Sequence, residues 1–238
     1  SPVASGLNNV GIFNEEEERD QQVDVFSFAF DWGIGDSGIV MSSQTSWLEY
    51  DKHDILDPDM SSFAVFVGER YEDFEQFSQE IRFTSPQDQP LAWMVGAYYQ
   101  EHDLTTSIQV HLPWTFDIPN FLFGAPPNPA NNGFSAISFG GPLVENSKWT
   151  SFFFSTTLNV SDTFRFNVGG RHQSIEKTGT ENPQVARLPI GGTAFQPLSA
   201  FGPPVSGKID SGDFLPEIGF QWDASDDVMI YAKYSEAV

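Results

Sequence analysis

The sequence predicts an all-β chain in which about eight long antiparallel strands form one open, curved sheet, a segment of a transmembrane β-barrel. The first observation is alternation of apolar and polar residues over segments of about ten to thirteen residues, the length with which a tilted strand crosses a bilayer. Soluble strands are about half as long. The second observation is that short turns and long connections alternate along the chain. The third is that the chain contains no run of about 18 apolar residues, which a transmembrane helix requires.

Strands are expected near residues 20–32, 39–51, 73–85, 91–103, 148–160, 164–176, 213–223 and 228–235. In the sixth, Phe164, Phe166 and Val168 alternate with Arg165 and Asn167, whereas the second has the weakest alternation. A period of two residues gives each strand one apolar and one polar face. The polar set, to which Arg171, Glu80, Glu217 and Lys233 also belong, cannot enter a dry core, because burying unpaired charges is costly. Alternation alone also permits a soluble sandwich whose charges face water.

The connections favour the membrane interpretation. Short turns follow the first, third, fifth and seventh strands, and long connections follow the others, at residues 52–72, 104–147 and 177–212. This arrangement gathers the short turns at one end of the sheet and the long connections at the other, as in outer-membrane barrels. Such long loops are uncommon in compact soluble domains. Aromatic residues occur near both ends of the strands and suggest the two girdles of a barrel wall: Trp32, Phe83, Trp93, Phe164 and Trp222 near the turns, and Trp47, Tyr50 and Tyr234 near the far ends.

Composition narrows the possible partners. The 33 acidic residues outnumber the 11 basic ones and give a net charge of −22, which argues against nucleic acid as a partner. Aromatic residues make up 15% of the chain, so disorder is not expected. The absence of cysteine excludes disulfides and thiolate metal sites. No signal peptide is recognisable at Ser1 and the chain ends abruptly at Val238, so we expect a fragment.

Four segments resemble barrel strands of TonB-dependent receptors and occur in the order found in that family. The third of these segments, Phe164–His172, is similar to the family's glycine-rich strand that ends in arginine and an aromatic residue. Together they place the resemblance over about residues 23–238. The segments are Phe77–Ser85 (FSQEIRFTS), Leu91–Tyr99 (LAWMVGAYY), Phe164–His172 (FRFNVGGRH), and the pair Phe214–Phe220 (FLPEIGF) with Asp226–Ser235 (DDVMIYAKYS).

The resemblance implies a receptor in the outer membrane of a Gram-negative bacterium that takes up a scarce ligand, such as a ferric siderophore, with energy supplied through TonB. The implied partners are outer-membrane lipid and lipopolysaccharide, the ligand, and the TonB complex acting through a plug region that is not in this chain. The family barrel has about 22 strands, so about a third of the wall is expected here. No plug or coupling residue can therefore be assigned.

Two alternatives to a transport receptor stay open. One is a passive porin, and the other is a secreted β-sandwich that binds carbohydrate. Eight strands could also close as a small barrel. We expect an open sheet instead, in which the first and eighth strands do not pair.

No catalytic, cofactor-binding or metal-binding residue is predicted, because nucleophile-elbow, phosphate-loop and Rossmann motifs are absent. The acidic segment Asp51–Asp59, with His53, could offer oxygen ligands to a hard cation, but it lacks the glycine and glutamate of a calcium loop. A solvated acidic loop is the favoured interpretation. His102, His111 and His172 are scattered without metal-ligand spacing.

Aromatic residues in the long connection at 104–147 are the weak candidates for ligand contacts: Trp114, Phe116, Phe121 and Phe123. They could line a vestibule for the ligand at the barrel mouth. They could equally pack against one another, and packing is the favoured interpretation, because aromatic side chains commonly hold long loops compact.

Overall fold

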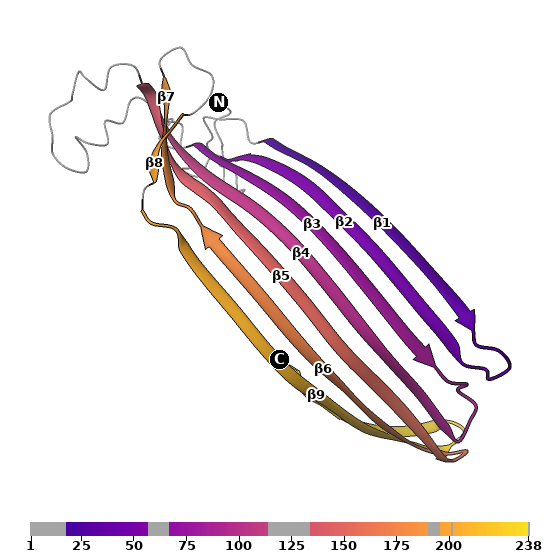
Figure 1. The fold of residues 1–238 in the computed structure, drawn as a ribbon. Helices are drawn as coiled ribbons and strands as arrows, with labels where there is room; N and C mark the ends of the chain where they lie inside the picture. Colours follow the sequence, from indigo (N-terminus) through magenta and orange to yellow (C-terminus); the bar gives the residue numbers. More distant parts are fainter. Residues whose placement is uncertain (1–17, 57–66, 114–133, 190–195, 201, 238) are drawn as a thin grey trace, which may run out of the picture.

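The computed structural model describes residues 18–56, 67–113, 134–189, 196–200 and 202–237, and in these ranges the chain forms strands and turns without a helix. Eight long strands lie side by side, each antiparallel to the next, in the order β1-β2-β3-β4-β5-β6-β9-β10 (Figure 1). They are β1 (Glu18–Gly33), β2 (Val40–Leu56), β3 (Val67–Thr84), β4 (Leu91–Pro113), β5 (Phe134–Ser161), β6 (Phe164–Glu181), β9 (Val205–Ser225) and β10 (Val228–Ser235).

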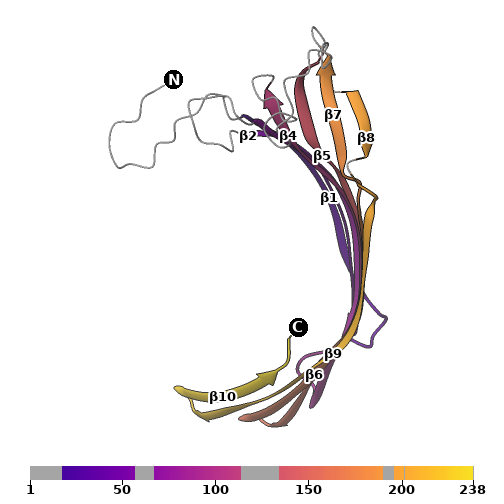
Figure 2. The same ribbon diagram turned by 90° about the vertical axis from the view of Figure 1, so that its left-hand side faces the viewer.

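The sheet is open and bends into an arc (Figure 2). In the described residues β1 pairs with β2 alone and β10 pairs with β9 alone, so the first and last strands do not meet. The expectation of an open, curved, all-β sheet is therefore confirmed, and closure into a small barrel is excluded for this part of the chain. The described part of the chain contains no helix long and apolar enough to cross a membrane.

All the short turns lie at one end of the sheet and the long connections lie at the other (Figure 1). The strands continue further toward the long-connection end than the sequence predicts. β4 extends to Pro113 and β5 begins at Phe134, within the segment expected to be a loop at 104–147, and β2 and β3 likewise extend into the expected loop at 52–72. The strands therefore extend into segments that the sequence analysis assigned to connections. In β4 the alternation continues through Leu104, Ile108 and Val110, but these residues lie on the opposite face from Val95, and this change of face obscured the strand.

A short hairpin occupies the connection expected at 177–212. It consists of β7 (Gln184–Pro189) and β8 (Gln196–Ala200), and β7 pairs with the start of β5 while β6 pairs with the rest of β5. Gly140 and Gly141 lie at this branch with φ values of 150° and 159°. A Cβ on Gly140 would lie 2.0 Å from the carbonyl oxygen of Ile108, so the close approach of β4 requires glycine.

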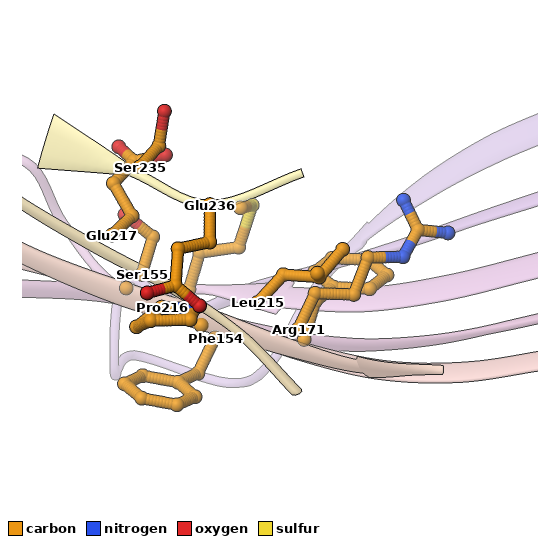
Figure 3. Close-up of a pocket in the computed structure, with 12 residues that line it drawn as sticks. Phe154, Ser155, Arg171, Leu215, Pro216, Glu217, Ser235 and Glu236 are labelled. Carbon is orange, nitrogen blue, oxygen red and sulfur yellow. The ribbon is translucent and has the colours of Figure 1, made fainter. Parts of the chain in front are cut away.

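The register places residues that pair directly on the same face, and it separates an apolar face from a polar one. Figure 3 shows Phe154 and Glu217 on opposite sides of the sheet. Side chains crowd together on the inside of a bent sheet, and the fully buried side chains Asp54 and Ser151 belong to the polar face. The polar face is therefore the concave face of the arc in Figure 2, and the apolar face is convex. Arg165, Arg171, Glu80, Glu217 and Lys233 all lie on the concave face, as their alternation predicts.

The convex face carries a continuous band of large apolar side chains between the short turns and a row formed by Phe26, Trp47 and Phe77. Phe26 is 66% exposed and Phe152 is 62% exposed, values that are unusual for so many neighbouring aromatic residues. An exposed apolar surface of this extent indicates a contact surface rather than a face bathed by water. Other exposed members of the band are Phe28, Phe30, Trp32, Ile81, Val95, Phe154, Leu158, Phe166, Val168, Ile218, Trp222 and Ile230.

Acidic residues follow immediately beyond this aromatic row on the convex face. Asp24, Glu49, Glu75 and Asp103 lie directly opposite one another across β1 to β4. In the next pair of convex-face residues, Asp73 lies directly opposite Asp51. Burial raises the pKa of the Asp73 carboxyl, and the facing Asp51 raises it further. Like charges in directly opposed positions destabilise a sheet.

Glu49→Gln is expected to stabilise the protein, because it removes the carboxylate between Asp24 and Glu75. The expected gain in the free energy of unfolding is about 0.2–1 kcal/mol at low ionic strength, the usual size of a cross-strand charge effect. It should fade in about 1 M salt, where the Debye length is about 3 Å. Urea unfolding in detergent at both salt concentrations measures it. Glu80→Gln is the matched control, since Glu80 lies 3.8 Å from the Arg82 guanidinium and its loss should not stabilise. An unchanged or lower stability of Glu49→Gln at low salt would contradict the repulsion.

Candidate functional site

The concave face carries three clusters of charged and aromatic side chains at different heights along the strands. The rim cluster lies near the long connections and consists of Arg19, Lys52, Asp54, Arg70 and Glu72. The middle cluster consists of Tyr50, Phe74, His102, Glu145 and Lys177. The arginine–aromatic cluster lies closer to the short turns and consists of Tyr98, Trp149, Ser151, Phe153 and Arg171.

Asp54 is the centre of the rim cluster and is 1% exposed. Arg19 Nε donates to its carboxylate at 2.8 Å, Arg70 Nη2 at 2.7 Å, and Lys52 Nζ lies at 3.0 Å. Burial opposes ionisation, but hydrogen bonds from Arg19, Arg70 and Lys52 outweigh it and hold the pKa of Asp54 below its ordinary value. The network joins the ends of β1, β2 and β3. Since its cations already have carboxylate partners, its role is structural.

The middle cluster connects stacked rings to an ion-paired carboxylate. Tyr50 stacks on Phe74 with ring centroids 5.0 Å apart, and the Phe74 ring lies 5.3 Å from His102. His102 Nε2 is 3.3 Å from Glu145 Oε1, and Lys177 Nζ is 2.6 Å from the same oxygen. Burial raises the pKa of Glu145, but hydrogen bonds from Lys177 and His102 lower it by more, so the net pKa lies below its ordinary value.

Glu145 should make stability depend on pH. Because its pKa is lower in the folded protein, its ionised form contributes stability that is complete above the unfolded value of about 4.5 and is lost as the pH falls below it. Glu145→Gln is therefore expected to flatten the decline in the unfolding midpoint between about pH 5 and pH 3. Thermal unfolding across this range measures the decline. Glu176→Gln is the control on the facing strand, and equal slopes in both variants would contradict the assignment.

Arg171 on β6 is enclosed by aromatic rings from the two preceding strands. Its guanidinium carbon lies 5.9 Å from the Tyr98 ring, 5.8 Å from the Trp149 ring and 5.9 Å from the Phe153 ring, all within cation–π range. Its Nη2 donates to Ser151 Oγ at 2.8 Å, and Ser151 is fully buried beneath the cluster. The arrangement holds the cation in a fixed position on the concave face.

Glycine on β4 makes room for this cluster. A Cβ on Gly96 would lie 2.4 Å from the Phe153 ring and 2.9 Å from the carbonyl oxygen of Ile81. The ring of Phe153 therefore occupies space that any larger residue at position 96 would fill. This explains why Gly96 interrupts the aromatic-rich strand.

A protein-family model described as TonB dependent receptor-like, beta-barrel matches residues 2–238. The chain belongs to this family. The chain also resembles two solved structures of such receptors. The ferric yersiniabactin uptake receptor FyuA from Yersinia pestis superposes with a TM-score of 0.62 at 13% sequence identity, over 94% of this chain and 31% of that one. For the ferric-catecholate import receptor Fiu from E. coli K12, the TM-score is 0.60 at 12% identity, over 94% of this chain and 36% of that one.

Because the sequence identities are low, these likenesses establish the fold alone. The chain spans about a third of the length of either solved receptor. A comparison with curated proteins finds no match. The resemblance to TonB-dependent receptors, predicted from four strand segments, is thus confirmed by the family model over nearly the whole chain.

The residues predicted to contact ligand in this TonB-dependent receptor barrel are not tested by the structure. Trp114, Phe116, Phe121 and Phe123 lie outside the described residues. The side chain of His111 also lies outside the described part, although its backbone belongs to β4. In the described residues, no group of three or more His, Cys, Asp or Glu side chains could hold a metal ion.

Two sequence interpretations are corrected. The segment Asp51–Asp59 was expected to be a solvated loop, yet residues 51–56 belong to β2 and Asp54 is almost fully buried. Two of the cations that surround Asp54, Arg19 and Arg70, come from neighbouring strands, and the local run of acids does not reveal them. Tyr50 was expected in an outer girdle, but it lies on the concave face against Phe74.

The arginine–aromatic cluster was not predicted. One signal was present in the sequence, because Tyr98 and Trp149 occupy positions whose alternation assigns them to the polar face. Large aromatic residues at polar-face positions indicate a specialised surface rather than a lipid contact. Their convergence on Arg171 depends on the register of three strands.

Proposed function

We propose that the chain forms part of an outer-membrane receptor of a Gram-negative bacterium that imports a scarce ligand, such as a ferric siderophore, with energy supplied through TonB. The observation that carries the proposal is the match of the family model over residues 2–238. The two solved receptors of similar fold are named for uptake of ferric yersiniabactin and import of ferric catecholate. Their names support the ligand class for this chain.

The two faces of the sheet support the membrane placement. The apolar band on the convex face extends from the short turns to the row of Phe26, Trp47 and Phe77. It covers eight residues in each of β1, β2 and β3, close to the roughly nine to eleven with which a tilted strand crosses the hydrocarbon core. The acidic row at Asp24 and Glu49 then lies at the level of the polar headgroups. In this orientation the short turns are periplasmic, and the convex face contacts outer-membrane lipid and lipopolysaccharide.

The concave face faces the barrel interior in this proposal. It carries paired charges, hydroxyl groups and amides such as Gln173, which suit a wet passage and a polar ligand. The family is one of transport receptors rather than enzymes, and the proposed role of the chain is to bind and pass on its ligand without chemical change. TonB is proposed to act through a plug region that lies outside these residues.

Uptake of radiolabelled ferric siderophore by cells tests the proposal. Cells producing the receptor should accumulate iron from a cognate siderophore, and the accumulation should disappear in a strain that lacks TonB. Equal uptake with and without TonB would favour a passive porin. A monodisperse, folded product in buffer without detergent would favour a secreted soluble sandwich.

A further inference from the structure

Three polar side chains interrupt the apolar band of the convex face on β2 and β3. They are Ser43, Thr45 and Gln79, and they lie between the short turns and the row that contains Trp47 and Phe77. Polar side chains are costly on the lipid-facing surface of a barrel, because hydrocarbon offers them no hydrogen-bond partner. In the membrane placement proposed above, these three side chains therefore need partners within the protein.

The amide of Gln79 joins the three side chains. Its Oε1 accepts a hydrogen bond from Thr45 Oγ1 at 2.5 Å, and its Nε2 donates to Ser43 Oγ at 3.0 Å. The same Nε2 donates to the backbone carbonyl oxygen of Glu80 at 2.9 Å. Both ends of an amide on β3 are thus bonded to hydroxyl groups of β2. We call Ser43, Thr45 and Gln79 the amide clasp.

The register of β2 against β3 lacks the usual determinants. Residues 57–66 join the two strands, so no tight turn fixes their alignment, as one does between β1 and β2. The middle of β2 is polar on both faces, because Ser42, Gln44 and Ser46 lie on the concave face while the hydroxyl groups of the clasp lie on the convex one. A strand that is polar on both faces specifies its register weakly through burial.

A slip of two residues would keep every side chain on its own face but would break the clasp. In one direction Gln79 would lie opposite Trp47, and in the other Met41 would take the place that Ser43 now occupies beside the amide. Either slip removes one hydroxyl partner, and the amide group that loses it would be unsatisfied in hydrocarbon. The observed register is the one that gives the amide a hydroxyl group at both positions.

We propose that the amide clasp fixes the register of β2 against β3 within the bilayer, in place of the apolar alternation that these segments lack. The proposal rests on the membrane placement in the proposed function, because water would otherwise replace a lost partner. At the rim, where water is present, the ion pair of Asp54 and Arg70 joins the same two strands. The clasp is the corresponding contact inside the apolar band.

Unfolding of the full receptor in phosphatidylcholine vesicles tests the clasp with one substitution at two positions of the convex face. Thr156 on β5 makes no side-chain hydrogen bond with the described residues, so Thr156→Val should raise the folding equilibrium constant, since valine enters lipid readily. Thr45→Val should lower this constant about three- to tenfold, the usual strength of a side-chain hydrogen bond in a membrane. Gln79→Leu should lower it as well, although leucine is the more apolar residue.

Disulfide cross-linking in a receptor without other cysteines reports the register directly, and this chain contains none. Ser46 lies opposite Ser78 on the concave face, so Ser46→Cys/Ser78→Cys should cross-link in the observed register. Ser46→Cys/Gln76→Cys and Ser46→Cys/Glu80→Cys should cross-link only after a slip of two residues. Adding Gln79→Leu should lower the yield of the first pair at least about threefold and raise that of a slipped pair.

Unchanged cross-linking of all three pairs in the presence of Gln79→Leu would overturn the proposal. So would a Thr45→Val variant as stable as Thr156→Val. If Gln79→Leu does not fold, Thr45→Val serves in both measurements. A lower folding constant for Thr156→Val would show that the convex face does not contact lipid, which overturns the membrane placement and the clasp with it. Neither measurement needs TonB or transport, so an intact clasp without TonB-dependent uptake overturns the receptor function alone.

Discussion

Asp54→Asn is expected to lower the free energy of unfolding by about 2 kcal/mol. The substitution leaves Arg19, Lys52 and Arg70 converging on a neutral amide at a position that is 1% exposed. Removing one partner of a fully buried ion pair costs about 3–5 kcal/mol. The loss should be smaller here, because the Arg19 side chain is 63% exposed and Arg70 is 32% exposed, so both keep contact with water. Urea unfolding of the receptor in detergent at neutral pH measures the difference.

Glu72→Gln is the matched control for the rim cluster. Glu72 contacts Lys52 and Arg70 at 3.5 and 3.6 Å from the margin of the network, so its neutralisation should cost much less. The two variants should also differ in acid. Since the folded pKa of Asp54 is lowered, its contribution is complete above about 3.8 and is lost as the pH falls below that value, a decline that Asp54→Asn should lack. Equal losses for Glu72→Gln and Asp54→Asn at neutral pH would show that Asp54 is not the centre of the cluster.

Gly96→Ala is expected to destabilise the protein by about 1–3 kcal/mol, the usual cost of overpacking a close-packed site. The new methyl group would lie 2.4 Å from the Phe153 ring, which can rotate, and 2.9 Å from the carbonyl oxygen of Ile81, which belongs to the backbone and cannot yield easily. Movement of Phe153 should also disturb Arg171, since the two side chains are in contact. Urea unfolding of the receptor in detergent measures the change.

Gly207→Ala provides the control, because a Cβ at that position meets no atom within 4 Å. It should be neutral or slightly stabilising, since alanine loses less conformational freedom than glycine on folding. The double variant Gly96→Ala/Phe153→Leu should recover part of the lost stability by giving the methyl group room. If Gly96→Ala and Gly207→Ala behave alike, the close contact with Phe153 does not constrain the sheet.

The strand extensions show where sequence reasoning reached its limit. Between the short turns and the row of Phe26, Trp47 and Phe77, one face is apolar and the other is polar, so alternation identifies the strands. Beyond that row the convex face becomes polar, and in β4 the alternation continues with its phase reversed, since Leu104, Ile108 and Val110 lie on the concave face. Backbone pairing continues there, but the apolar residues have moved to the other face, so the pattern no longer matches that of the preceding part of the strand. The extra strand length and the β7–β8 hairpin were therefore expected to be loop.

The sequence by itself determined the all-β class, the order of the strands, the separation of short turns from long connections, and the face on which Arg165, Arg171 and Lys233 lie. These features follow from a two-residue period and from turn composition, both of which are local. Only the tertiary structure decided which side chains meet. Asp54 meets Arg70 across β2 and β3, and Arg171 meets Tyr98 across three strands, because the register aligns them. Register depends on pairing between distant segments, and local alternation contains no information about which rung of one strand faces which rung of the next.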